Sequence, residues 1–269
     1  MTHPPTDTER FWDREAATYD AAHGDDLAPD NPLWIRMAAA LRLLGASFEK
    51  GSVVDCGMGP GRLLVELARS GWSVAGVDLS GEMVARARAR LPESADRLVQ
   101  GSIESLPFPS KSFDAAVATG VLEYVEDVPR ALSEVSRVLR PSGLFVVGAP
   151  NTRSFGTVWR HRIVYAAVRP LKSRLRFGRA VPRPRPGLIS RPHLQAQLAS
   201  VGLEVEQIEY VALTPAPLRL RFPSVSRRLA GLLGGTLLGP FFASQLVLAA
   251  RKRDEARLPR TALRGENEM

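Results

Sequence analysis

Hydrophobic and polar positions alternate in a regular rhythm along the first 150 residues. Short apolar runs lie at positions 53–54, 73–77, 97–100, 112–119 and 144–151. Segments with a helical period follow, and the first of them, 62–70, places Leu63, Leu64, Leu67 and Ala68 on one face. Runs as apolar as 144–151 must be buried on both faces, as parallel strands are. The rhythm therefore predicts a doubly wound α/β sheet.

The later part of the chain continues this pattern more loosely. A helix is predicted over 128–139, ended by Pro141-Ser142-Gly143 before the strand at 144–151. Further on we expect a helix over 189–201 with Gly202 as its C′ residue, then strands over 203–213 and 244–252. The chain thus has enough elements for one α/β domain with additions.

The first predicted strand runs directly into a turn that carries an acid and three alternating glycines. These residues are Asp55, Gly57, Gly59 and Gly61. Glycine lets the backbone approach a ligand without interference from a Cβ atom. A dinucleotide fingerprint requires G-x-G-x-x-G, but Arg62 stands where its third glycine would be. The turn therefore predicts a nucleotide-like ligand other than a dinucleotide.

A second acid stands at the tip of the second predicted strand. Asp78 follows Gly61 by seventeen positions, where a carboxylate can accept both hydroxyls of a ribose. The same feature occurs in NAD enzymes, so it indicates a ribose without choosing the cofactor.

In this order, the segments resemble the class I S-adenosylmethionine (SAM) dependent methyltransferases, of the type 11 or ubiquinone-menaquinone methyltransferase-like kind. SAM has no pyrophosphate, but its α-amino group and sulfonium suit carboxylate and carbonyl acceptors. The resemblance is dense over 11–151 and loose over 188–252. It implies SAM as cofactor and a Rossmann-like, doubly wound, seven-stranded sheet whose last strand is antiparallel.

The resemblance also implies a set of cofactor-binding residues. Ser102 stands where many relatives have an Asp for the adenine, so the Ser102 hydroxyl, Glu104 or the backbone could take that role. Met83 is expected near the adenine, with ordinary helix core as the alternative. The whole set is Asp55, Gly57, Gly59, Gly61, Asp78, Leu79, Met83, Ser102, Ile103, Thr119, and Tyr19 from the N-terminal cover.

Catalytic residues are less well defined. Methyl transfer is an in-line displacement, so alignment supplies much of the acceleration, and a base helps only when the acceptor must lose a proton. The candidates are Glu123, Tyr124, His161 and His193, with surface or capping roles as the alternative for each histidine. No metal-ligand spacing occurs, and the single cysteine, Cys56, excludes an internal disulfide.

Charge divides the chain into two unlike halves. Residues 1–134 hold 13 lysines and arginines against 21 acids, whereas residues 135–253 hold 20 against 3. The segment 158–168, inside a basic insertion at 152–187, can form a helix with an apolar and a basic face, which suits an anionic membrane surface. The family resemblance implies that this insertion builds a lid over the acceptor. Residues 229–250 are uncharged and long enough for a membrane span, but Gly234, Gly235 and Pro240 interrupt them.

These observations predict five regions. They are an N-terminal helical cover (1–49), a SAM-binding core (50–151), the lid (152–187), the rest of the fold (188–252) with an apolar flap at 214–242, and a disordered tail (253–269). The N-terminus has no signal-peptide core, so we expect a cytoplasmic protein, with peripheral attachment to the inner membrane surface as an option.

The predicted function is transfer of a methyl group from SAM to a small apolar or lipid-linked acceptor, with oxygen favoured as the acceptor atom. A quinone-like ring, a natural product and a glycolipid all suit a basic, apolar lid. Two alternatives remain: a methyltransferase that uses the basic half on RNA or protein, and a non-catalytic SAM-binding membrane protein. Nucleic acid is less favoured, because Thr119-Gly120-Val121-Leu122 replaces the motif of amino-methylating DNA enzymes.

Overall fold

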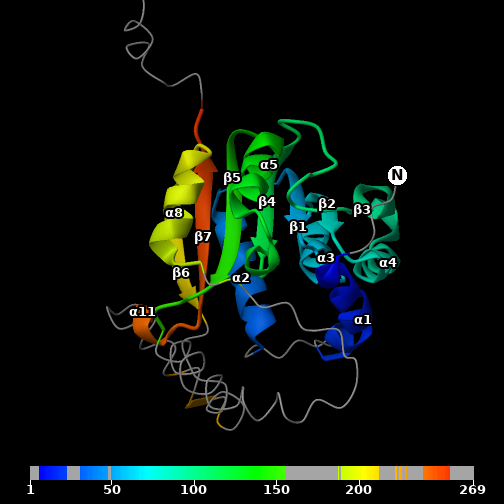
Figure 1. The fold of residues 1–269 in the computed structure, drawn as a ribbon, viewed down its shortest axis with the longest axis horizontal. Coiled ribbons are helices and arrows are strands. Elements are labelled where there is room, and N and C mark those ends of the chain that lie inside the picture. Colours follow the sequence, from blue (N-terminus) through cyan, green and yellow to red (C-terminus); the bar gives the residue numbers. More distant parts are fainter. Residues whose placement is uncertain are drawn as a thin grey trace, which may run out of the picture.

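The computed structural model describes residues 6–22, 31–47, 50–154, 187, 189–211, 222, 224–225, 228 and 239–254. Within these residues, seven strands form one sheet in the order β3-β2-β1-β4-β5-β7-β6 (Figure 1). The strands are β1 (Ser52–Cys56), β2 (Ser73–Asp78), β3 (Leu98–Gln100), β4 (Phe113–Thr119), β5 (Leu139–Pro150), β6 (Leu203–Val211) and β7 (Gln245–Lys252).

The pairing of these strands confirms the predicted α/β, Rossmann-like sheet. Strands β1 to β5 pair in parallel, while β7 runs antiparallel to both β5 and β6. The last strand in the chain is therefore the antiparallel one, as predicted, and it lies between its two neighbours rather than at the edge.

Helices cover both faces of the sheet (Figure 1). Side chains of α5 and α8 join one core with alternate strand residues such as Val54, while α2, α3 and α4 join a second core with residues such as Val53. The helices are α1 (Asp7–Ala22), α2 (Pro32–Ser47), α3 (Arg62–Arg69), α4 (Gly81–Arg90), α5 (Val128–Val138), α8 (Arg191–Ser200) and α11 (Gly239–Phe242). Two 3₁₀ turns, η1 (Pro92–Arg97) and η2 (Leu122–Tyr124), lie between them.

The start of β5 differs from the prediction. The sequence of 141–143 predicted a stop before a strand at 144, but β5 already begins at Leu139, directly after α5. Ser142 takes a left-handed φ of 61°, and the register with β4 shifts between Phe113 and Ala115. Residues 141–143 have the composition of a loop but form part of an irregular strand, because the bulge changes the pairing of β5 with β4 without ending it.

Several predicted regions lie partly or wholly outside the described residues. They include 155–186 of the lid, most of the flap at 214–242 and the tail from 255 onward. The uncharged run at 229–250 is not one continuous helix, since its last residues form β7. Over the part of the chain that is described, no helix has the length and hydropathy needed to span a bilayer.

Candidate functional site

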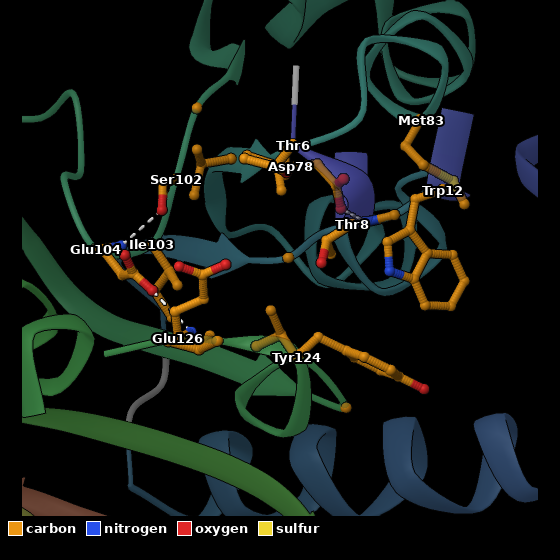
Figure 2. Close-up of a pocket in the computed structure, with 18 of the residues that line it drawn as sticks. Thr6, Thr8, Trp12, Asp78, Met83, Ser102, Ile103, Glu104, Tyr124 and Glu126 are labelled. Atoms are coloured by element: carbon orange, nitrogen blue, oxygen red, sulfur yellow. Dashed lines mark hydrogen bonds between the residues drawn. The ribbon is translucent and has the colours of Figure 1, made fainter. Parts of the chain in front are cut away.

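A cavity of about 620 Å³ lies at the carboxyl ends of the parallel strands, where ligands bind in open α/β sheets (Figure 2). Figure 2 shows Met83 and Trp12 on one side of it and Ser102, Ile103 and Glu104 on the other. Nine of the predicted cofactor-binding residues line it: Tyr19, Gly57, Gly59, Asp78, Leu79, Met83, Ser102, Ile103 and Thr119.

The glycine turn shapes one wall of this cavity. Gly57 and Gly59 take left-handed φ angles of 80° and 54°. A Cβ atom on Gly57 would lie 2.7 Å from the Cβ of Val121, so only glycine fits there. A Cβ atom on Gly59 would meet no protein atom within 4 Å, which leaves that space open to a ligand.

Gly61 has a different role in the structure. It is not among the residues that line the cavity; it caps α3 with φ 81°, and a Cβ atom there would lie 2.9 Å from the Cβ of Ala87 in α4. The glycine thus permits α3 and α4 to approach each other. Ligand contact by Gly61 remains a prediction from the family resemblance.

Replacing Gly61 with alanine is expected to destabilise the protein by about 2 kcal/mol, from backbone strain and overpacking against Ala87. Urea unfolding measures this change. Gly45→Ala is the matched control, because Gly45 lies in α2 with no atom within 4 Å of its Cβ position. This substitution should stabilise the protein by about 0.5–1 kcal/mol, since alanine favours a helix more than glycine does. Equal effects from the two substitutions would contradict the packing role of Gly61.

Asp78 is held rigidly at the cavity. Its Oδ2 accepts a hydrogen bond from the Gly59 amide at 2.8 Å, and its Oδ1 accepts one from the Ser80 amide at 2.9 Å. Burial raises the pKa of this carboxyl, although the two amide hydrogen bonds act in the opposite direction. Each carboxylate oxygen has two lone pairs, so both can still accept from the hydroxyls of a ribose.

Met83 belongs to the helix core and also lies at the cavity, while its contact with the adenine stays a prediction. Its side chain is buried in the structure and also lines the cavity. Its amide donates to the Ser80 hydroxyl at 3.1 Å, which caps the N-terminus of α4 and fixes the methionine beside Asp78.

Asp55 lies in a second, smaller cavity of about 50 Å³ that shares Tyr19, Gly57, Gly59 and Thr119 with the first. Its Oδ1 is buried and has no hydrogen-bond partner among the described residues. Burial, and then the charge of Asp78, raise the pKa of the Asp55 carboxyl to about 8. A buried acceptor without a donor indicates a place for a ligand's N–H group.

The loop after β3 forms the opposite wall. The Ser102 hydroxyl accepts from the Glu104 amide at 3.1 Å, and the Glu104 carboxylate accepts from the amides of Glu126 and Asp127 at 3.0 Å (Figure 2). Glu104 therefore joins this loop to the one before α5. Its Oε1 is engaged in doing so, while the Ser102 hydroxyl keeps its proton for donation.

The ring of Trp12, a residue that the sequence analysis did not identify, completes the cavity. The ring of Trp12 contacts Tyr19 edge-on, with centroids 5.8 Å apart, and Tyr124 likewise at 5.3 Å. Trp12 and Tyr19 are seven residues apart in α1, so a helical period could have placed them on one face. The contact between Trp12 and Tyr124 joins α1 to the turn after β4.

Helix α1 is fastened to the core by two carboxylates. The Asp13 carboxylate accepts from the Ser80 hydroxyl at 2.6 Å and from the Glu82 amide at 3.2 Å. The Asp20 carboxylate accepts from Arg62 at 2.7 Å and from Arg90 at 2.8 Å. These contacts hold α1 as a wall over the glycine turn.

The four catalytic candidates lie in different surroundings. Tyr124 lines the cavity, and Glu123 is buried beside it with an Oε2 atom that has no partner among the described residues. His193 is exposed in the first turn of α8 and is not among the residues that line either cavity, which agrees with the surface or capping role that was its alternative. His161 lies outside the described residues.

The fold and the two acidic cavities define an α/β protein of the SAM-dependent methyltransferase class. A family model described as a methyltransferase domain matches residues 54–147. A 2-phytyl-1,4-naphtoquinone methyltransferase from Trichormus variabilis is 32% identical over 175 residues, which cover 61% of this chain and 75% of that protein. The chain belongs to the SAM-dependent methyltransferase family.

Other relatives agree with this family but match shorter parts. A malonyl-[acyl-carrier protein] O-methyltransferase from Pectobacterium atrosepticum is 36% identical over 92 residues, 34% of this chain and 36% of that protein. The chain spans about half or less of the length of the first curated relatives it matches. A SAM-dependent methyltransferase structure from Thermotoga maritima superposes with a TM-score of 0.61 at 21% identity, covering 91% of this chain and 99% of that one, and supports the fold.

The residues present fit SAM, the cofactor of this family. Asp55 offers an unpartnered acceptor for the α-ammonium group, and Asp78 offers acceptors for the ribose hydroxyls. The main cavity, with its volume of about 620 Å³, lies within the usual range for small-molecule sites.

Proposed function

We propose that this protein transfers a methyl group from SAM to an oxygen atom of a small apolar or lipid-linked acceptor. The observation that carries the proposal is a pair of acids, the buried Asp55 and the half-buried Asp78, at two cavities that share four residues, of which the larger also has an aromatic wall. The acids suit the polar parts of the cofactor. The rings of Trp12 and Tyr124 suit an apolar acceptor.

The chain's own residues supply position and exclusion of water. When bound, SAM supplies an electrophilic methyl group on a sulfonium. Asp55 would hold its α-ammonium group and Asp78 its ribose hydroxyls, and α1 covers the glycine turn through Asp13 and Asp20. Alignment of this kind accounts for a large part of the barrier reduction in displacement reactions.

The names of two relatives support the choice of acceptor. One is named for a phytyl naphthoquinone, which is a ring with a lipid tail, and another is named as an O-methyltransferase. The buried Glu123 carboxyl beside Tyr124 further favours oxygen, because a hydroxyl acceptor must lose a proton and a carboxylate with a raised pKa can receive it. The lid that would meet a lipid tail rests on the sequence alone.

Incubation of the protein with isotopically labelled SAM and a bacterial lipid extract tests this proposal. Mass spectrometry should find the label on an apolar small molecule as an O-methyl group. Label in RNA or protein would favour the alternative use of the basic half, and tight SAM binding without transfer to any fraction would contradict an enzymatic role.

A further inference from the structure

The large apolar side chains that are exposed in the described part of the chain all come from one stretch of sequence. They are Phe222, Val225, Phe241 and Phe242, with exposed fractions of 51%, 47%, 58% and 43%. The last two are neighbours in α11, the single helical turn that precedes β7. Exposed apolar side chains that gather in one region, rather than lying scattered over the surface, indicate a place where another surface binds.

The turn α11 is fixed to the sheet by a buried side chain. The side-chain amide of Asn151 donates to the Pro240 carbonyl at 2.7 Å and to the Ala243 carbonyl at 2.8 Å. The backbone amide of Asn151 donates to the Ser244 carbonyl at 2.9 Å. Asn151 and Ala243 are buried, whereas the two phenylalanines between these anchor points are exposed. The rings are therefore presented by a held turn and not by a frayed end.

The same turn lies at the edge of the sheet where the main cavity lies. Strand β5 ends at Pro150, which pairs with Gln245 at the start of the antiparallel β7, so α11 is at the carboxyl edge of the parallel strands. Figure 1 shows α11 and the cavity helix α1 at the same end of the sheet. Neighbouring strands are about 5 Å apart, so the start of β7 is about 10 Å across the sheet from the end of β4, whose Thr119 lines the cavity.

The sequence on both sides of the anchor carries positive charge and no negative charge. Residues 151–190 hold ten lysines and arginines, residues 210–250 hold four arginines, and neither range holds an acid. Arg153 is exposed, and its amide donates to the Oδ1 atom of Asn151 at 3.1 Å, so this cation lies beside the anchor of α11. A second copy of this chain would meet the surface with like charge, which opposes self-association. Aromatic rings beside cations match an anionic lipid bilayer, where rings enter the interface and cations meet phosphates.

We propose that Phe241 and Phe242 insert into the surface of an anionic bilayer, with Arg153 at the lipid headgroups, and that this contact turns the cavity edge of the sheet toward the membrane. Docking itself does not depend on the chemistry at the cavity. Its use, which is to bring a lipid-linked acceptor to the cavity, rests on the proposed function. The contact is peripheral, because a single helical turn reaches only the interface of the bilayer.

The size of the exposed surface sets the expected strength of the contact. The exposed fractions of Phe241 and Phe242 add up to about one whole phenylalanine. Transfer of that much apolar surface out of water strengthens binding about 10- to 100-fold. An arginine near an anionic surface adds about fivefold, and this part weakens as salt screens the charge. The aromatic and the cationic contributions can therefore be measured separately.

Vesicle flotation of the full chain tests this inference, with vesicles of phosphatidylcholine alone and of phosphatidylcholine mixed with phosphatidylglycerol. The wild-type protein should bind the mixed vesicles more tightly. Replacing both phenylalanines (Phe241→Ser with Phe242→Ser) should weaken that binding about 10- to 100-fold. Arg153→Gln should weaken binding about fivefold for the mixed vesicles and leave that for phosphatidylcholine unchanged. Arg69→Gln is the matched control and should change nothing, because this exposed arginine lies in the last turn of α3, which leads back to the amino edge.

A polarity-sensitive dye shows whether α11 itself enters the lipid. The single cysteine, Cys56, is buried, and burial raises the pKa of its thiol, so it reacts slowly with a maleimide. A nitrobenzoxadiazole group attached in the Phe242→Cys variant should therefore label one position. Its emission should rise and shift to the blue when mixed vesicles are added. The same dye in the Arg69→Cys variant should show no change.

Four results would overturn the inference. They are no binding of the wild-type protein to mixed vesicles at low salt, equal binding to both kinds of vesicle, equal binding by the double phenylalanine variant, and a wild-type dimer that this variant cannot form. Unchanged Tm in each variant shows that the fold is intact. Flotation needs neither SAM nor an acceptor. Failure of methyl transfer in the labelling experiment would therefore contradict the proposed function and leave docking to be judged by flotation.

Discussion

Replacing Asp55 with asparagine is expected to stabilise the ligand-free protein and, at the same time, to weaken SAM binding by about 10- to 100-fold. The buried Oδ1 atom of Asp55 has no partner among the described residues, so its negative charge is unfavourable until a cation arrives. Asparagine keeps the shape and removes the charge. The gain in the free energy of unfolding should be about 1–3 kcal/mol at pH 8.

The pH dependence of this effect has a defined sign. The folded state raises the pKa of Asp55 from 3.8 to about 8, so between these values the folded protein holds a proton that the unfolded chain releases. Stability contributed by this proton is present below about pH 4 and is lost as pH rises toward 8. Thermal unfolding of wild type and Asp55→Asn should therefore diverge as pH rises from 5 to 8.

Asp114→Asn is a control for which we expect the opposite change in stability. Asp114 lies in β4 of the same sheet, where burial is outweighed by hydrogen bonds from Arg140 and Ser52, and its pKa is lowered. Asp114→Asn should therefore destabilise the protein at pH 7. A Tm for Asp55→Asn below that of wild type at pH 8 would contradict an unpaired charge at Asp55.

Asp20→Ala is expected to release α1 from the core. The Asp20 carboxylate lies among Arg62, Arg86 and Arg90, and its removal leaves three cations without their shared anion. Loss of one member of a buried ion cluster is expected to lower the local opening free energy by about 3 kcal/mol. Amide hydrogen exchange over 6–22 should then accelerate roughly a hundredfold, and SAM affinity should fall because α1 forms a cavity wall.

The cluster also sets how acid affects α1. Burial disfavours ionisation of Asp20, but the hydrogen bonds from Arg90 and Arg62 outweigh it and lower the pKa. This stabilisation is present above about pH 4 and is lost as pH falls through the lowered pKa. Asp7→Ala, which removes only an exposed pair with Arg10 on the same helix, serves as the control. Unchanged exchange over 6–22 in Asp20→Ala would show that other contacts hold the helix.

Much of the fold could be predicted because buried parallel strands leave a clear record in sequence. The runs that became β1, β2, β4 and β5 are apolar on both faces, and the rhythm of strand and helix follows from that burial. The start of β5 could not be predicted, because Pro141-Ser142-Gly143 has the composition of a turn and only its pairing partners keep it in the sheet.

Some residues of the candidate site could likewise be predicted from the sequence, and others could not. Residues close in sequence to a strand end, such as Gly57 and Asp78, were found by spacing alone. The closeness of Arg36 to Gly120 could not be predicted, because it depends on how α2 packs against the turn after β4, 63 residues beyond Gly57. Gly61 shows that glycine spacing can also suggest a ligand contact where none is needed, because the close approach of α3 and α4 at Ala87 explains this glycine without any ligand.

The position of β7 has a consequence for synthesis of the chain. Because β7 lies between β5 and β6, the ribosome produces β6 before the strand that must connect it to the sheet exists. Until Gln245–Lys252 emerges, β5 is an open edge and β6 has no neighbour in the described sheet. The nascent protein must therefore shield an apolar edge for the time that the ribosome needs to add these last residues, and chaperones would be needed most in that interval.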